Sequence, residues 1–291
     1  MPTIKELRLR IKSLQNTSKI TSAMKMVSAA RLRRAQEAFN RTRPYYQKMQ
    51  ELLEQVTASF PDLDHPLMKV RETKKIRYYV LASDRGLCGA FNNNLLKHFV
   101  RNIDASKAMD AVGLGRRAKD YVVKNKYAVA KGTDALTNLP SFASAGAIAQ
   151  SAIQDFISGD VDQVYLVYNQ YKSALSQVPI SVQILPFLKP SAADLAKNKK
   201  DKSFRLDYIV EPNPTEVFNE LLPQLVTIQV FRSLLENAVG EHTARMTAMD
   251  AATKNTKELI GSLTLKMNRA RQAAITKELI EIVSGAEALN A

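Results

Sequence analysis

The sequence is short of the residues that punctuate, cross-link or anchor a chain. Among 291 residues there are one cysteine, no tryptophan, 10 glycines and 11 prolines, and no run of 18 apolar residues. The single cysteine excludes an intrachain disulfide and a cysteine-rich zinc site, and the missing apolar run predicts that no helix crosses a membrane. Acidic residues are also few, 28 against 42 basic ones, so the net charge of +14 predicts an acidic partner such as nucleic acid, anionic lipid or an acidic protein surface.

The few glycines and prolines are unevenly placed along the chain. No glycine precedes Gly86, Pro44 is the only proline from residue 3 to residue 60, and no proline follows Pro223. Because helix ends and turns usually need these residues, both ends of the chain are predicted to be long helices. Pro44 should kink the first helix or end its first half, because it lacks a backbone donor.

Both ends also carry the 3-and-4 spacing of a coiled-coil seam. In the first 60 residues one frame runs from Ile4 to Phe60, with polar residues on it between Ser18 and Ser28. The C-terminal segment repeats the spacing from Leu221 to Ala274, where Arg232 is among the residues that interrupt it. We predict that the two helices pair antiparallel as a long coiled coil.

The middle of the chain alternates strand and helix patterns. Such alternation predicts a Rossmann-like α/β domain with a mainly parallel, doubly wound sheet. The predicted domains are the N-terminal helix 1–60, the α/β domain 61–212 and the C-terminal helix 213–291. The expected strands are Ile76–Ser83, Met109–Val112, Tyr127–Ala130, Gln163–Tyr168, Val178–Phe187 and Phe204–Val210, and the expected helices between them begin near Phe91, Arg116 and Ala145.

One motif in this domain has the form of a dinucleotide fingerprint. Gly113-Leu114-Gly115-Arg116-Arg117-Ala118 reads G-x-G-x-x-A between a predicted strand and a helix, and Asp134 follows at the distance of a ribose-binding acid. However, the fingerprint normally follows the first strand, whereas this motif follows the second. The two glycines therefore either bind a nucleotide or form a tight strand-to-helix turn.

Other chemistry has weaker support. Cys88 is either a nucleophile or a small buried side chain, and the three histidines show no triad-like pattern with it. No histidine or carboxylate cluster indicates a metal site, and no cofactor is expected. The basic N-terminal helix either binds DNA or faces an acidic protein, and its basic residues overlap the heptad frame, which a basic leucine-zipper region would not do.

Three stretches of the chain resemble one family. Ile20-Thr21-Ser22-Ala23-Met24-Lys25-Met26-Val27, Asp84-Arg85-Gly86-Leu87-Cys88-Gly89 and Asn268-Arg269-Ala270-Arg271-Gln272-Ala273-Ala274-Ile275-Thr276-Lys277-Glu278-Leu279 are similar, in order, to the gamma subunits of F-type ATP synthases. The resemblance implies a non-catalytic central rotor: an antiparallel coiled coil that turns inside a hexamer of alpha and beta subunits. Its implied partners are those subunits, the epsilon subunit and the membrane ring of c subunits, and no nucleic acid.

The resemblance also implies roles for particular residues. Arg271, Gln272 and Thr276 match residues that grip loops of the beta subunits near the end of the shaft. Met24 and Arg245 match a pair beside the acidic lever of the beta subunit.

Two residues match the foot that meets the c ring, Tyr208 and Glu211. The cysteine-bearing insert of the chloroplast form is absent, so no thiol switch is expected. The lack of an N-terminal extension leads us to expect a bacterial protein, peripheral on the cytoplasmic face of the plasma membrane.

Overall fold

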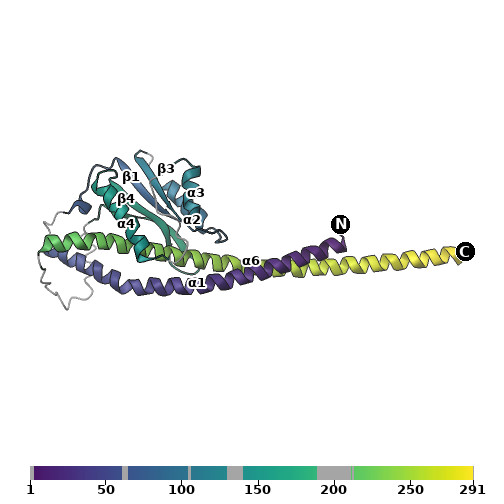
Figure 1. Ribbon diagram of the computed structural model, residues 1–291. Coiled ribbons are helices and arrows are strands. Elements are labelled where there is room, and N and C mark those ends of the chain that lie inside the picture. Colours follow the sequence, from purple (N-terminus) through teal and green to yellow (C-terminus); the bar gives the residue numbers. More distant parts are fainter. Residues whose placement is uncertain are drawn as a thin grey trace. The chain divides into compact units, whose positions relative to one another are not determined.

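The computed structural model describes residues 3–60, 65–103, 106–129, 140–188, 211 and 213–290. The chain divides into two compact units. The helical unit comprises residues 1–29 and 245–291, and the mixed unit comprises residues 30–244. Two long helices, α1 (Ile4–Ser59) and α6 (Pro214–Asn290), each contribute to both units (Figure 1).

The mixed unit contains a five-stranded sheet in the order β3-β2-β1-β4-β5. The first four strands are parallel and β5 runs antiparallel to β4, so the predicted, mainly parallel sheet is confirmed. The predicted strand Phe204–Val210 lies outside the described residues. The strands are β1 (Lys75–Leu81), β2 (Ala108–Leu114), β3 (Ala128–Val129), β4 (Gln163–Tyr171) and β5 (Gln177–Leu185); the shorter helices are η1 (Pro66–Met68), α2 (Phe91–Arg101), α3 (Arg116–Lys124) and α4 (Phe142–Ile157).

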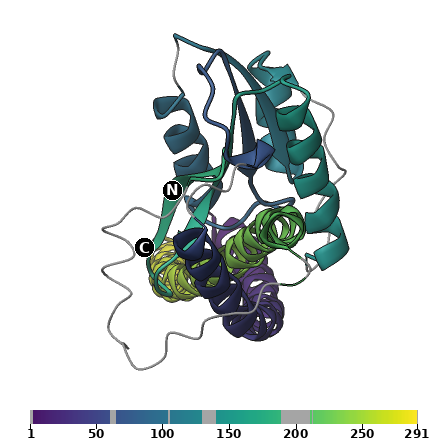
Figure 2. The same cartoon turned by 90° about the vertical axis from the view of Figure 1, so that its left-hand side faces the viewer.

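Two separate apolar cores cover the two faces of this sheet. Side chains of α2 and α3, including Leu95, Phe99 and Val122, pack on the face that carries Tyr78 and Val80. On the opposite face, α4 and the parts of α1 and α6 in the mixed unit form the larger core. Figure 2 looks along the long helices and shows α4 beside the first, green part of α6. The start of the C-terminal helix therefore belongs to the core of the α/β domain.

A buried ion cluster joins β1, β2 and α4. The guanidinium of Arg77 donates to both carboxylate oxygens of Asp110, at 2.7 and 2.9 Å, and also to Asp155. Burial alone would lower the pKa of Arg77, but the hydrogen bonds and charge of Asp110 outweigh burial and raise the pKa above its ordinary value. The guanidinium of Arg77 therefore remains charged inside the domain.

Pro44 does not end the first helix. It lies inside α1, which continues to Ser59, so that part of the prediction is wrong. A proline within a helix costs about 3 kcal/mol. Beyond it, Met49, Leu53 and Val56 are buried in the larger core, and burial of such side chains contributes about 1.5–3 kcal/mol each. The tertiary packing thus outweighs the local penalty.

Candidate functional site

The seam of the helical unit is polar where the sequence pattern loses its apolar residues. Thr21 and Ser28 of α1 are buried, whereas Ile20 and Val27 are exposed by more than half. The hydroxyls of Thr21 and Ser28 donate to backbone carbonyls one turn earlier, at 3.1 and 2.8 Å. These short side chains keep the heptad frame, satisfy their own donors and allow the backbones to approach closely.

Two side-chain contacts join α1 to α6 in this unit. Thr253 Oγ1 lies 2.8 Å from Thr21 Oγ1, and Lys25 Nζ lies 2.6 Å from Asp250 Oδ1. A hydrogen bond from Lys25, aided by its charge, lowers the pKa of Asp250 below its ordinary value. Because the numbers rise along α1 as they fall along α6, the two helices are antiparallel, as predicted.

The residues expected to meet the beta subunit all lie in the helical unit. Met24 is half-buried, whereas Arg245 is 6% exposed. Arg271, Gln272 and Thr276 are exposed on α6, and the Thr276 hydroxyl donates to the carbonyl of Gln272 at 3.0 Å. These three side chains are available to a partner.

The two residues expected to meet the c ring have a different outcome. Glu211 is exposed, and Tyr208 lies outside the described residues. Only Glu211 of this pair therefore lies among the described residues.

The end of α6 carries a row of uncovered apolar side chains. Ile275, Leu279, Ile282 and Val283 are between 51% and 69% exposed. Contiguous exposed apolar side chains of this size mark an interaction surface. This part of α6 is therefore suited to burial against another protein.

The glycines of the fingerprint-like motif are explained by close packing. A Cβ on Gly113 would lie 2.5 Å from the amide nitrogen of Lys119, and one on Gly115 would lie 2.1 Å from the carbonyl oxygen of Ala82. Gly115 also has φ of 89°, a conformation that favours glycine. The structure thus supports the tight turn as the reason for both glycines.

The start of α3 is capped by the chain itself. Asp84 Oδ1 accepts from the amide of Arg116 at 2.8 Å, and the carbonyl of Ser83 accepts from the amide of Arg117 at 3.2 Å. A pyrophosphate bound by this fingerprint would need such amides and would be repelled by the carboxylate. Asp134, the expected ribose ligand, lies outside the described residues.

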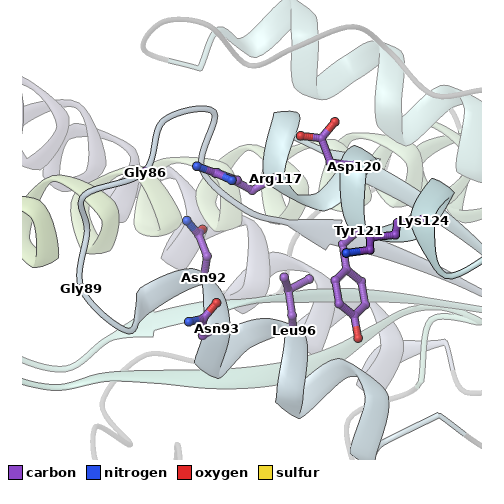
Figure 3. Close-up of a pocket in the computed structure, with 9 residues that line it drawn as sticks. All are labelled: Gly86, Gly89, Asn92, Asn93, Leu96, Arg117, Asp120, Tyr121 and Lys124. Carbon is purple, nitrogen blue, oxygen red and sulfur yellow. The ribbon is translucent and has the colours of Figure 1, made fainter.

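A surface cleft of about 380 Å³ lies beside this turn, between α2 and α3 (Figure 3). Its lining includes Gly86, Asn92, Arg117, Asp120 and Lys124. The side chain of Arg117 extends toward Gly86, and Asp120 places a negative charge beside the two basic groups. The mixed signs do not form an anion site.

Cys88 is a buried side chain rather than an accessible thiol. It is 2% exposed, and Asn92 Nδ2 lies 3.2 Å from its sulfur. Among the described residues no group of histidine, cysteine and carboxylate side chains is arranged to hold a metal. Nor does any helix in that part of the chain have the length and apolarity needed to cross a membrane.

Sequence reasoning missed the side chains that hold α6 against the sheet. Glu236 and Asn237 are 7% and 5% exposed, and both accept hydrogen bonds from backbone amides of β4. Arg232, noted only as an interruption of the seam, lies one turn before Glu236. The sequence did offer one signal: Arg232 and Glu236 are opposite charges four residues apart in an otherwise mostly apolar part of the predicted helix.

These features define a class of protein: an α/β domain whose chain also forms a long antiparallel helical pair. The family model described as ATP synthase matches residues 3–289. The ATP synthase gamma chains of Desulforamulus reducens and Pelotomaculum thermopropionicum are 43% and 42% identical to this chain, each over 99% of it and 100% of the relative. The chain belongs to the ATP synthase gamma chain family, so the resemblance of its motifs is confirmed.

Solved structures share the fold. The rotor of the Euglena gracilis mitochondrial ATP synthase matches with a TM-score of 0.65 and 21% identity, covering 94% of this chain and 98% of that one. The central stalk and c ring of the Tetrahymena thermophila enzyme include a chain that matches with a TM-score of 0.57 and 24% identity, covering 80% and 99%. Neither the nucleotide-binding nor the DNA-binding alternative is favoured by these comparisons.

The turn at Gly115 generates a first prediction. Gly115→Val will lower the free energy of unfolding by more than about 2 kcal/mol, because it adds a strained φ and a backbone clash. Gly86→Ala is the matched control, since its Cβ would meet only the flexible end of Arg117, at 3.0 Å. Denaturant unfolding measures both. Titration calorimetry of the unmutated chain with ATP or NAD should show no saturable binding; saturable binding that Gly115→Val abolishes in a folded chain would contradict the packing explanation.

The register of the helical unit generates a second prediction. Thr21→Cys combined with Thr253→Cys will form an intramolecular disulfide on mild oxidation, because the two hydroxyls are 2.8 Å apart and disulfides need adjacent Cβ atoms. Gel mobility without reductant measures the cross-link. Thr21→Cys with Thr256→Cys, about one turn out of register, is the control. Preferential cross-linking of the control pair would show that the register is wrong.

Proposed function

We propose that this chain is the central rotor subunit of an F-type ATP synthase, coupling ion flow through the membrane sector to ATP synthesis and hydrolysis at the alpha and beta subunits. The observation that carries the proposal is the exposed apolar row at the end of α6, on a chain that belongs to the gamma chain family. Such a row is stable in water only when other subunits surround it. The chain itself is not catalytic in this proposal.

The long helices suit a rotating shaft. At about 1.5 Å per residue, the 77 residues of α6 extend about 115 Å without interruption. The polar seam keeps the helical unit slim, and its hydroxyls are satisfied within the pair. Torque applied in one unit passes to the other through the continuous backbones of α1 and α6.

The proposed partners follow from the roles that the family resemblance implies for particular residues. Arg271, Gln272 and Thr276 would contact loops of the beta subunits, and Met24 with Arg245 would lie beside their acidic lever. These contacts place the helical unit inside the hexamer of alpha and beta subunits.

The remaining proposed partners are the c ring and the epsilon subunit. Tyr208 and Glu211 would contact the c ring, and the epsilon subunit would bind the rotor as well. The chain would then lie at the cytoplasmic face of a bacterial plasma membrane, held there by the complex.

Reconstitution tests this function. The chain is co-expressed with the alpha and beta subunits of its organism, and the purified assemblies are assayed for ATP hydrolysis. We expect a stable, active complex only when the chain is present, because the exposed end of α6 and the inner surface of the hexamer cover each other. An equally stable and active complex without the chain would refute the proposal.

Met24→Lys tests the position beside the acidic lever. The added ammonium should form an ion pair with the lever that must break in each turn, so assembly will persist while proton pumping per ATP hydrolysed falls. Met26→Lys is the matched control, because Met26 is 65% exposed on another side of α1. Pumping and hydrolysis are measured together in inverted membrane vesicles. Unchanged coupling in Met24→Lys would remove this assignment without affecting the rotor proposal.

A further inference from the structure

The sheet of the mixed unit has a gap that α6 fills. The registered pairing of β4 with β1 ends at Val167 and Val80, but β4 continues to Tyr171 beside β5. Past that point, no strand among the described residues lies beside the edge of β4 that faced β1. Buried amides there need other acceptors, since an unsatisfied buried donor is strongly unfavourable.

Side chains of α6 supply these acceptors. Asn237 Oδ1 accepts from the amide of Asn169 at 3.4 Å, and Glu236 Oε1 accepts from the amide of Tyr171 at 3.2 Å. The helix thus takes the place of the missing strand along two residues of β4. Here α6 lies against the carboxyl end of β4, at the edge of the sheet where doubly wound sheets usually bind ligands.

The backbone of α6 also lies close to the domain at this point. A Cβ on Gly240 would lie 3.1 Å from the ring of Phe91 and 3.5 Å from the side chain of Gln177. Asn169 Nδ2 donates to the carbonyl of Phe91 at 3.3 Å, which links the start of α2 to the same cluster. Helix, strand and loop are therefore held in one arrangement.

The same cluster reaches α1 through Arg232. Its guanidinium lies 4.4 Å from the ring centroid of Tyr46 and 5.2 Å from that of Phe39, both within range of a cation–π interaction. Burial raises the pKa of Glu236, while the hydrogen bond from Tyr171 and the charge of Arg232 act in the opposite direction. Tyr168 hydrogen-bonds to Glu236 as well. The cluster connects β4, α6 and α1.

We propose that Glu236 and Asn237 are positioning residues that prevent α6 from rotating or sliding against the α/β domain, so that torque passes between the domain and the shaft. The surrounding contacts of α6 are largely apolar, and apolar contacts do not specify direction. Hydrogen bonds to fixed backbone amides do. This inference rests on the proposed rotor function.

Isosteric variants in the whole ATP synthase test the proposal. Glu236→Met and Asn237→Leu keep side-chain volume but remove the oxygen acceptors, whereas Glu236→Gln keeps an acceptor. We expect each isosteric variant to assemble and hydrolyse ATP while protons pumped per ATP fall roughly twofold or more, because the buried amides lose their partners. Glu236→Gln should retain normal coupling, because its side chain still offers an oxygen acceptor. Asn219→Ala with Glu220→Ala, an exposed Asn-Glu pair on the same helix, is the matched control.

The outcomes separate this inference from the rotor proposal. If the unmutated complex pumps protons and both isosteric variants pump equally well, the positioning role is wrong and the rotor function stands. A Glu236→Gln variant as impaired as Glu236→Met would also contradict it, because the acceptor would then be irrelevant. If either Glu236→Met or Asn237→Leu fails to assemble, the proton pumping of the other variant decides the outcome. The pumping of Glu236→Gln is then compared with that of the variant that assembled. If the unmutated chain supports no pumping complex, the rotor proposal itself fails.

Discussion

The structure depends on one constraint: β4 extends past its pairing with β1, and the backbone amides of the unpaired residues must find other hydrogen-bond acceptors. Glu236 and Asn237 provide them, which fixes α6 along the sheet. Once α6 is placed, Arg232 positions Phe39 and Tyr46 of α1 against it. The four residues of β4 that extend past its registered pairing with β1 thus connect the sheet to α6.

The helical unit is under a different constraint, because its two helices must pack closely while their outer surfaces remain suited to contact with other proteins. Leucine-rich seams would bury more apolar area but would separate the backbones. Threonine and serine lie there instead, and their hydroxyls bond to the helices' own carbonyls and to each other. Orientation comes from the Lys25–Asp250 pair, and the apolar residues are moved outward, where Ile20 and Val27 are exposed.

The long helices and the parallel sheet followed from the sequence, because missing glycine and strand-helix alternation are local signals. The sequence left open whether Pro44 kinks the first helix or ends its first half; that α1 continues through Pro44 reflects the burial of Met49 and Leu53 in a core built from distant segments. The register of Lys25 with Asp250 depends on how the chain folds between them. Nothing along the chain reveals that β1 ends before β4, so the sequence pattern did not assign Glu236 to this contact. Gly113 and Gly115 are the opposite case: the sequence shows the spacing of a nucleotide-binding motif, but the structure explains both glycines by close contact with the backbone.

The most direct test is amide hydrogen exchange of Asn169 and Tyr171 in the full-length chain, resolved by nuclear magnetic resonance. The amide of Val167, inside the paired region of β4, is the protected reference, and that of Leu175, an 87% exposed residue between β4 and β5, is the unprotected one. If α6 takes the place of a strand, both test amides exchange as slowly as Val167, and Tyr171 loses this protection in Glu236→Met. Exchange of both amides as fast as Leu175 in the unmutated chain would contradict the account.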